Sequence, residues 1–278
     1  MCIAVYDLSA CPCFSRNDSR SIDTSVKRSW ADNSEEAPVL NDFDLRGLRV
    51  AVTGGTSGLG LALVRNLAAR SARVAFVGRR SELVERLARE TGACGVVGDV
   101  GRKEDIHPMA IEIAWSLGGL DVLINNASSL GPTTLKLLAD TDCEELQDAL
   151  AVNVLGPFRL TRALFGALTA SAREGRGAAV INISSDAAVN AYPNWGAYGA
   201  SKAALRHMTA IWEEEARDER VRFLSIDPGD MDTPLHALAV PDADPATLKR
   251  PADAAQEIVA SILSALREGV STALLPPA

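Results

Sequence analysis

From Leu48 onward, short runs of β-branched and other apolar residues alternate with longer stretches whose apolar positions recur with helical spacing. This pattern is typical of strand–helix–strand units around a parallel sheet, so we predict a doubly wound α/β fold with a seven-stranded parallel sheet flanked by helices. The expected strands are Arg49–Thr53, Arg73–Val77, Gly95–Val97, Asp121–Asn125, Val180–Ile183, Val221–Ile226 and Thr272–Leu275. The expected helices are Leu59–Ala69, Glu82–Glu90, Ile106–Leu117, Glu144–Ala170, Ala197–Ala216 and Ala254–Leu266.

Residues 1–44 have a different composition. They are rich in Ser, Asp, Asn and Arg, and they show no sustained period of 2 or of 3.6 residues. A polar segment without a periodic apolar face has little surface to bury, so we predict a flexible N-terminal extension. The folded part is then a single domain over residues 45–278.

Composition and charge exclude several classes of function. The 278 residues suit one large domain, and the net charge of -8 disfavours nucleic acid as a partner. The five cysteines lack the paired Cys or Cys/His spacing of a zinc site, so we expect no bound metal. Because the sequence shows no membrane-spanning apolar run and no secretory signal pattern, we expect a cytoplasmic protein that does not contact membranes.

A glycine-rich turn joins the first expected strand to the first expected helix. Glycines allow a tight turn and a close approach of the backbone to a ligand, and free amides at the start of a helix favour negative charge. In this context the turn predicts a site for the pyrophosphate of a dinucleotide, as in a Rossmann-type fold. The expected contacts are Gly54, Thr56, Ser57, Gly58, Leu59 and Gly60.

A second pattern places a tyrosine and a lysine on one helix face. Tyr198 and Lys202 lie four residues apart in an expected helix, so both side chains can reach the same site. A neighbouring ammonium group favours the phenolate and would lower the pKa of Tyr198 from its usual value of about 10. Tyr-x-x-x-Lys alone is a common surface pair, but here it follows Ser185, which comes directly after an expected strand.

Taken in order along residues 48 to 275, these motifs resemble the short-chain dehydrogenase/reductase family. The glycine turn has the family's form Thr-Gly-x-x-x-Gly-x-Gly, and Asn125-Asn126-Ala127-Ser128 resembles its Asn-Asn-Ala-Gly. Ser128 departs from this pattern, since serine tolerates positive φ less well than glycine. The resemblance also implies cofactor contacts by several further residues: Asp99 and Val100 at the adenine, Asn126 and Ala127, and Pro228, Gly229 and Thr233 at the nicotinamide carboxamide.

The resemblance implies a reaction and a role for each central residue. Hydride would pass between a nicotinamide and a carbonyl or secondary alcohol substrate, which is a small molecule, with Tyr198 as general acid/base. Lys202 would hold the ribose and adjust the pKa of Tyr198, Ser185 would orient the substrate oxygen, and Asn153 would help to hold a water for proton relay to Lys202. A plainer interpretation of Asn153 is a mid-helix asparagine that the helix tolerates through a kink or a hydrogen bond.

The end of the second expected strand bears on the choice of cofactor. In such folds a carboxylate at this position accepts hydrogen bonds from the free 2'-hydroxyl of NAD, whereas a guanidinium pairs with the 2'-phosphate of NADP. Here Val77 is followed by Gly78-Arg79-Arg80, with no acid. We therefore predict a preference for NADP(H), with Arg79 as the phosphate partner and Gly78 leaving room for the phosphate, while Arg80 either stacks on the adenine or assists Arg79.

Two further expectations concern assembly and access to the site. The expected helices Glu144–Ala170 and Ala197–Ala216 carry more apolar positions than one sheet face can cover, which predicts a homo-oligomer, either a tetramer or a dimer. A short substrate lid is expected near residues 230–251. The main alternative function is a cofactor-sensing regulatory protein of the same fold without turnover, although such proteins often lack the tyrosine or the lysine.

Overall fold

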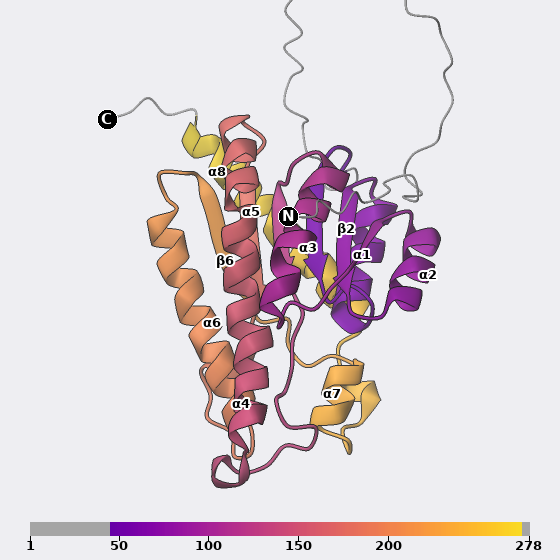
Figure 1. Cartoon of the computed structure of the whole chain (residues 1–278), viewed down its shortest axis with the longest axis vertical. Coiled ribbons are helices and arrows are strands. Elements are labelled where there is room, and N and C mark those ends of the chain that lie inside the picture. The colour runs from indigo at the N-terminus through magenta and orange to yellow at the C-terminus, as the bar shows by residue number, and fades with distance from the viewer. Residues whose placement is uncertain (1–44, 274–278) are drawn as a thin grey trace, which may run out of the picture. The chain divides into compact units, whose positions relative to one another are not determined.

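The computed structural model describes residues 45–273, with side chains described through residue 268. Within these residues a parallel sheet of six strands has the order β3-β2-β1-β4-β5-β6 (Figure 1). Strand order reverses between β1 and β4, which confirms the predicted doubly wound α/β class. The strands are β1 (Arg49–Thr53), β2 (Arg73–Gly78), β3 (Cys94–Val97), β4 (Val122–Asn125), β5 (Ala178–Ile183) and β6 (Val221–Ile226).

The predicted seventh strand, Thr272–Leu275, is wrong in its described part. Thr272 and Ala273 end the helix α8 (Pro251–Ala273), and residues 274 and 275 lie outside the described residues. The helical pattern continues into this segment because Gly269 alone does not end a helix, and the next proline is Pro276. The predicted extension at residues 1–44 also lies outside the described residues.

Helices cover both faces of the sheet. On one face α1 (Gly58–Ala69), α2 (Ser81–Thr91) and α8 bury a core that includes Leu63, Phe76 and Ile258. On the other face α3 (Lys103–Leu117) and α5 (Gly156–Arg173) bury a core that includes Ile113, Leu123 and Leu164. Strands β4 and β5 are buried along their whole length, as expected for strands covered on both faces. No described helix is long and apolar enough to span a bilayer.

The long helix that the sequence predicts over Glu144–Ala170 is interrupted. It consists of α4 (Cys143–Leu150), a π-helical turn at Ala151–Leu155, and α5. A π-turn inserts an extra residue per turn and redirects the side chains that follow, and such turns occur frequently at functional sites. Here the turn contains the buried side chain of Asn153.

Three connections extend beyond the carboxyl ends of the central strands. We call them the β4 loop (126–142), the β5 loop (184–195) and the β6 loop (227–250). The β6 loop contains α7 (Pro234–Ala239), which lies below the sheet in Figure 1, and the β5 loop leads into α6 (Gly196–Glu215). In doubly wound sheets, ligands bind at this edge.

Candidate active site

The glycine turn is packed so closely that side chains cannot be added to it. Gly54 and Gly58 adopt φ values of 68° and 50°, which L side chains rarely adopt. A Cβ on Gly60 would overlap the carbonyl oxygen of Gly54, so helix α1 begins directly against the turn. Ser57 precedes α1 as its N-cap residue, whereas Leu59 is buried in the core and can meet a ligand only through its backbone. The turn therefore presents backbone amides at a helix start, which suits a pyrophosphate.

Asn126 holds this turn from the neighbouring strand. Its Nδ2 donates to the carbonyl oxygens of Thr53 at 2.9 Å and Gly54 at 3.3 Å. In return, the Oγ1 of Thr53 accepts from the backbone amides of Asn126 at 3.0 Å and Ala127 at 3.1 Å. The structure thus assigns the Asn126 side chain to shaping the glycine turn.

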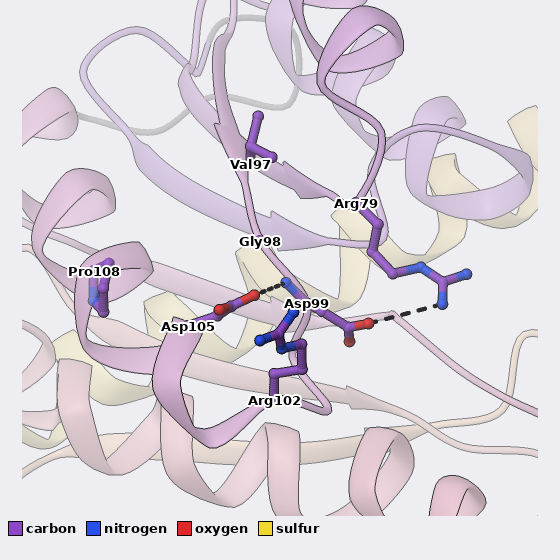
Figure 2. A pocket seen from close by; sticks show the side chains of 7 residues that line it. All are labelled: Arg79, Val97, Gly98, Asp99, Arg102, Asp105 and Pro108. Carbon is purple, nitrogen blue, oxygen red and sulfur yellow. Dashed lines mark hydrogen bonds and ion pairs between the residues drawn. The ribbon is translucent and has the colours of Figure 1, made fainter.

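A cavity of about 310 Å³ lies where β2 and β3 end. Its lining residues are Arg79, Val97, Gly98, Asp99, Arg102, Asp105 and Pro108 (Figure 2). Arg79 lies across from Asp99, with 3.8 Å between guanidinium and carboxylate, and its side chain is 77% exposed and so accessible to a ligand. Asp99 is also held in place, because its Oδ1 accepts from the amide of Gly101 at 2.8 Å.

Three residues predicted near this cavity do not line it. Arg80 is exposed and does not line the cavity, and the Val100 side chain is buried in the core. Gly78 does not open space for a ligand, because a Cβ there would collide with the side chains of Thr56 and Val84. Position 78 therefore requires a glycine because the Thr56 side chain packs against it.

Tyr198, Lys202 and Ser185 meet where β5 ends. Tyr198 and Lys202 lie on α6 and are 8% and 2% exposed, so both are withdrawn from solvent. The Lys202 Nζ donates to the carbonyl oxygen of Ile183 at 2.7 Å and lies 5.5 Å from the centroid of the Tyr198 ring. The Ser185 Oγ accepts from the amide of Ala187 at 3.2 Å.

The pKa of Tyr198 shifts opposite to the sequence-based expectation. Burial raises it to about 12, although hydrogen bonding with Ser185 and Ser128 acts in the other direction. Burial also lowers the pKa of Lys202 to about 8. The expectation considered only the charge of the lysine, whereas in the fold the cost of desolvating each charged form is the larger effect.

Asn153 faces the same site from the π-turn. Its Nδ2 donates to the carbonyl oxygen of Ser129 at 2.7 Å and to the Oγ of Ser201 at 2.8 Å, and its Oδ1 accepts from the Ser129 amide at 2.8 Å. Ser201 in turn donates to the carbonyl oxygen of Tyr198 at 2.7 Å. Asn153 therefore ties the β4 loop to the helix that carries Tyr198 and Lys202.

Ser128 is a site residue whose contribution the sequence did not indicate. It is not among the described residues with positive φ, so replacing the family's glycine introduces no left-handed strain. Its Oγ donates to the Oδ1 of Asn153 at 3.2 Å, and it also forms a hydrogen bond that lowers the pKa of Tyr198. It therefore lies between the phenol and Asn153.

A network of buried side-chain amides that links β4, β5 and α6 was also not predicted from the sequence. Asn125 and Asn182 are register partners on β4 and β5, and the Nδ2 of Asn125 donates to the Oδ1 of Asn182 at 2.8 Å. Asn182 in turn donates to Thr209 on α6 at 2.8 Å. The only sequence signal is that both asparagines come at the ends of neighbouring apolar strands. The network joins β4, β5 and α6, the elements that lead into or carry the reactive groups.

The β6 loop reaches the glycine turn through Thr233. The Thr233 Oγ1 caps α7 by accepting from the amide of His236 at 3.2 Å. Its Cγ2 lies 3.2 Å from the position that a Cβ on Gly58 would occupy, so the two segments are in contact. Pro228 is buried and Gly229 has a φ of 76°, which gives the loop its sharp start. These predicted residues thus lie along one edge with the turn and Tyr198.

Comparisons with known proteins agree with this arrangement. The chain is 33% identical to an NADP-dependent (R)-specific alcohol dehydrogenase from Lentilactobacillus kefiri, over 69% of this chain and 76% of the relative. A short-chain dehydrogenase from Escherichia coli complexed with NADPH superimposes with a TM-score of 0.72 at 28% identity, covering 84% of this chain and 96% of the other. A 3-ketoacyl-(acyl-carrier-protein) reductase from Brucella melitensis complexed with NADH gives 0.72 at 26% identity, covering 78% and 90%.

The family assignment follows from sequence and geometry together. Residues 49–244 match the family described as short chain dehydrogenase, and this span contains the glycine turn, Asn153, Ser185, Tyr198 and Lys202. The predicted resemblance is confirmed, and the chain belongs to the short-chain dehydrogenase/reductase family of oxidoreductases.

Proposed function

We propose that this chain is an NADP(H)-dependent oxidoreductase that interconverts a carbonyl compound and a secondary alcohol, with Tyr198 as the general acid/base. The observation that carries the proposal is the meeting of Ser185, Tyr198 and Lys202 at the same sheet edge as the glycine turn. A regulatory protein that only senses the cofactor could use Lys202 at the ribose, but it has no need for a phenol and the Ser185 hydroxyl placed together to exchange a proton with a substrate oxygen.

The described residues fit a dinucleotide. The glycine turn excludes any Cβ and presents amides at the start of α1, and the cavity beyond β2 and β3 offers an accessible guanidinium. Arg79 would pair with a 2'-phosphate, Asp99 and the cavity wall would meet the adenine, and Pro228, Gly229 and Thr233 would meet the nicotinamide end. One relative is named as NADP-dependent and one solved neighbour holds NADPH, whereas another holds NADH. The preference for NADP(H) therefore rests on Arg79.

In the reduction direction, a bound reduced nicotinamide would supply the hydride, which carries two electrons, to the carbonyl carbon. Tyr198 gives its phenolic proton to the carbonyl oxygen, so that the product is the neutral alcohol and the phenolate remains to be reprotonated from solvent. A pKa raised to about 12 keeps this proton on the phenol throughout the physiological range. Ser185 would hold the carbonyl oxygen beside the phenol, and Lys202 would hold the ribose.

Reprotonation can use groups that the structure fixes beside Tyr198. Asn153 is held by Ser129 and Ser201, so its amide cannot rotate freely. Ser128 adds a hydroxyl between Asn153 and the phenol. We assign Asn153 and Ser128 to positioning a proton path to solvent, together with Lys202.

The proposal also includes association into a homo-oligomer and a lid over the substrate site. Leu155 in the π-turn and Ile211 on α6 are 41% and 45% exposed, which supports association through these helices. Leu205, another apolar residue of α6, is only 1% exposed and cannot contribute. Helix α7 would serve as the lid, because it contacts both the glycine turn and the apolar residues around Tyr198.

The test is NADPH oxidation by the purified chain with a panel of ketones and aldehydes, run beside the Tyr198→Phe variant. We expect turnover by wild type, and a loss in kcat of about 10² to 10⁴-fold in the variant with the NADPH dissociation constant nearly unchanged. NADPH binding without turnover of any carbonyl compound would instead support the regulatory alternative.

A further inference from the structure

A small apolar cluster surrounds Tyr198, separate from the two cores on the sheet faces. Its buried members are Leu130, Ala187 and Tyr198, one from each of three segments that meet beyond the strand ends. Leu235 and Ala239 of α7 and Trp195 pack against it, and the Trp195 and Tyr198 rings lie 5.7 Å apart. The β4, β5 and β6 loops therefore converge on the reacting phenol through apolar side chains.

The same loops also leave large apolar side chains in solvent. Of eleven such exposed side chains in the described part of the chain, six belong to these loops, so exposure is concentrated at this edge of the sheet. They are Leu137, Leu138, Val189, Tyr192, Leu238 and Val240. Exposed apolar side chains gathered in one region mark a surface that binds an apolar partner or ligand. The six exposed side chains belong to the same loops as the residues around Tyr198. An apolar ligand that binds at Tyr198 would therefore be able to contact them.

The charges on these loops are mostly negative. The three loops contain eight aspartates, no glutamate and three basic residues. Each basic residue has an acidic partner on or near a neighbouring helix: Lys136 with Glu145 at 2.8 Å, Lys249 with Glu257 at 2.8 Å, and Arg250 with Asp253 at 2.7 Å. Carboxylates outside the loops thus offset the three positive charges, and the loops themselves carry more negative than positive charge.

Two of the aspartates, Asp186 and Asp227, act electrostatically on Tyr198. Asp186 accepts from the Ser185 Oγ at 3.1 Å and from the Tyr192 hydroxyl at 2.6 Å, which fixes its carboxylate beside the residue expected to orient the substrate oxygen. Asp227, which accepts from the amide of Gly229 at 2.9 Å, lies at the start of the β6 loop. Both carboxylates raise the pKa of Tyr198, so their field acts at the phenol.

We propose that the substrate is an uncharged, predominantly apolar carbonyl compound or secondary alcohol, and that Asp186 and Asp227 select against substrates bearing a carboxylate or phosphate. This inference rests on the proposed oxidoreductase function and deepens it by naming the substrate class. The apolar cluster binds the body of the substrate, and the two carboxylates repel an anion held nearby. Both carboxylates are exposed, so the repulsion is strongest at low ionic strength and is reduced by added salt.

The test compares two ketones that are closely matched except for charge, methyl 4-acetylbenzoate and 4-acetylbenzoate, with NADPH as the reductant. We expect kcat/KM for the ester to exceed that for the acid by at least about tenfold in wild type. The Asp186→Asn and Asp227→Asn variants should each reduce this ratio several-fold. Asp218→Asn makes the same change of charge on the exposed segment that precedes β6, at the opposite edge of the sheet, and should leave the ratio unchanged.

A separate measurement tests whether the apolar cluster binds the body of the substrate. Along the series from 2-butanone to 2-octanone, each added methylene that is buried can strengthen binding by up to about 0.8 kcal/mol, or roughly fourfold. We expect kcat/KM to rise along the series, and the slope to fall in the Leu235→Ala variant. A flat series in wild type would overturn this half.

The possible outcomes distinguish a failure of the proposed oxidoreductase function from a failure of the inferred substrate class. If wild type binds NADPH but reduces neither ketone nor any simple aldehyde, the proposed function itself fails. If it reduces both ketones equally well, or prefers the acid, the oxidoreductase function stands and the inferred substrate class is wrong. If the Asp218→Asn control changes the ratio as much as Asp186→Asn does, selection arises from total charge and the assignment to Asp186 is wrong.

Discussion

The two edges of the sheet both bury charged groups, but they treat them in opposite ways. At the amino edge, Asp121 has no exposed surface and is bound by Arg49 at 2.6 Å, by Arg176 at 3.0 Å and by the hydroxyl of Ser171. At the carboxyl edge, Lys202 is nearly as buried, but among residues 45–273 its ammonium has a single hydrogen-bond acceptor, the carbonyl oxygen of Ile183.

The pKa shifts express this difference. Burial alone would raise the pKa of Asp121, yet the hydrogen bonds from Arg176, Arg49 and Ser171 bring it below its usual range. Burial lowers the pKa of Lys202 to about 8, and the attraction of Asp227 is too weak to reverse that shift. A fully paired charge stabilises the fold at one edge, and a poorly compensated charge is kept at the other edge, where it can act on a ligand.

The largest expected effect on stability comes from breaking the amino-edge cluster. Asp121→Asn leaves two arginines without their carboxylate, and removing one partner of a buried pair costs about 3 kcal/mol or more. We expect urea denaturation to show this loss, while kcat per folded molecule stays near that of wild type. A large fall in kcat at unchanged stability would show that the two edges are not separate in function.

The matching substitution at the carboxyl edge should change the free energy of unfolding in the opposite direction. Lys202→Met removes a desolvated ammonium and keeps the volume, so we expect it to increase the free energy of unfolding at pH 7 by about 1 to 3 kcal/mol while abolishing most turnover. A variant less stable than wild type at pH 7 would contradict this assignment.

The comparison of wild type with Lys202→Met also predicts how their difference in stability changes with pH. In the folded state Lys202 loses its proton at about pH 8, whereas in the unfolded chain it does so at about 10.5. Between these values the unfolded state binds more protons, so wild-type stability rises with pH in this window. The stability advantage of Lys202→Met should therefore be complete below pH 8 and should shrink toward pH 10.5.

A smaller effect is expected at the cofactor cavity. Arg79→Ala should weaken NADPH binding by about 10 to 100-fold and leave NADH binding nearly unchanged, because a charge-assisted pair contributes roughly 1.5 to 3 kcal/mol. Arg80→Ala is the matched control, since Arg80 is exposed but does not line the cavity. Equal wild-type affinities for the two cofactors, or an unchanged ratio in Arg79→Ala, would refute this role.

The smallest effect is expected at Ser128. Ser128→Gly restores the family's usual residue and removes one hydrogen bond that lowers the pKa of Tyr198. We expect the pH at which reduction declines to move upward and kcat to fall only a few-fold. Because glycine is compatible with the local backbone, a merely structural role would leave the pH profile unchanged, and that result would remove Ser128 from the proton path.

Local sequence patterns predicted most of the fold because strands and helices carry their own periodicity. Strands β1 and β6 begin and end where predicted, since their apolar runs have sharp polar or glycine boundaries. The π-turn was not predictable, because a helix with one extra residue in a turn still shows nearly helical spacing. The predicted strand at Thr272–Leu275 failed because a short apolar run suits a helix and a strand equally well.

The sequence was likewise sufficient to identify the motif residues of the site, but it did not predict their pKa shifts or their contacts. Spacing placed Tyr198 and Lys202 on one face, yet the direction of the Tyr198 pKa shift depends on burial, which arises only when three loops fold around it. The roles of Ser128 and the Asn125–Asn182 pair depend on contacts between segments distant in sequence. The side-chain collisions that require Gly78 also appear only in three dimensions.

The most direct test of the account follows the hydride itself. NADPH carrying deuterium at the transferable C4 position is incubated with methyl 4-acetylbenzoate and the purified chain, and the alcohol product is analysed by mass spectrometry. We predict one deuterium per product molecule, on the carbinol carbon, and no product beyond the uncatalysed background with Tyr198→Phe. Alcohol without deuterium, or equal product from the variant, would contradict hydride transfer centred on Tyr198.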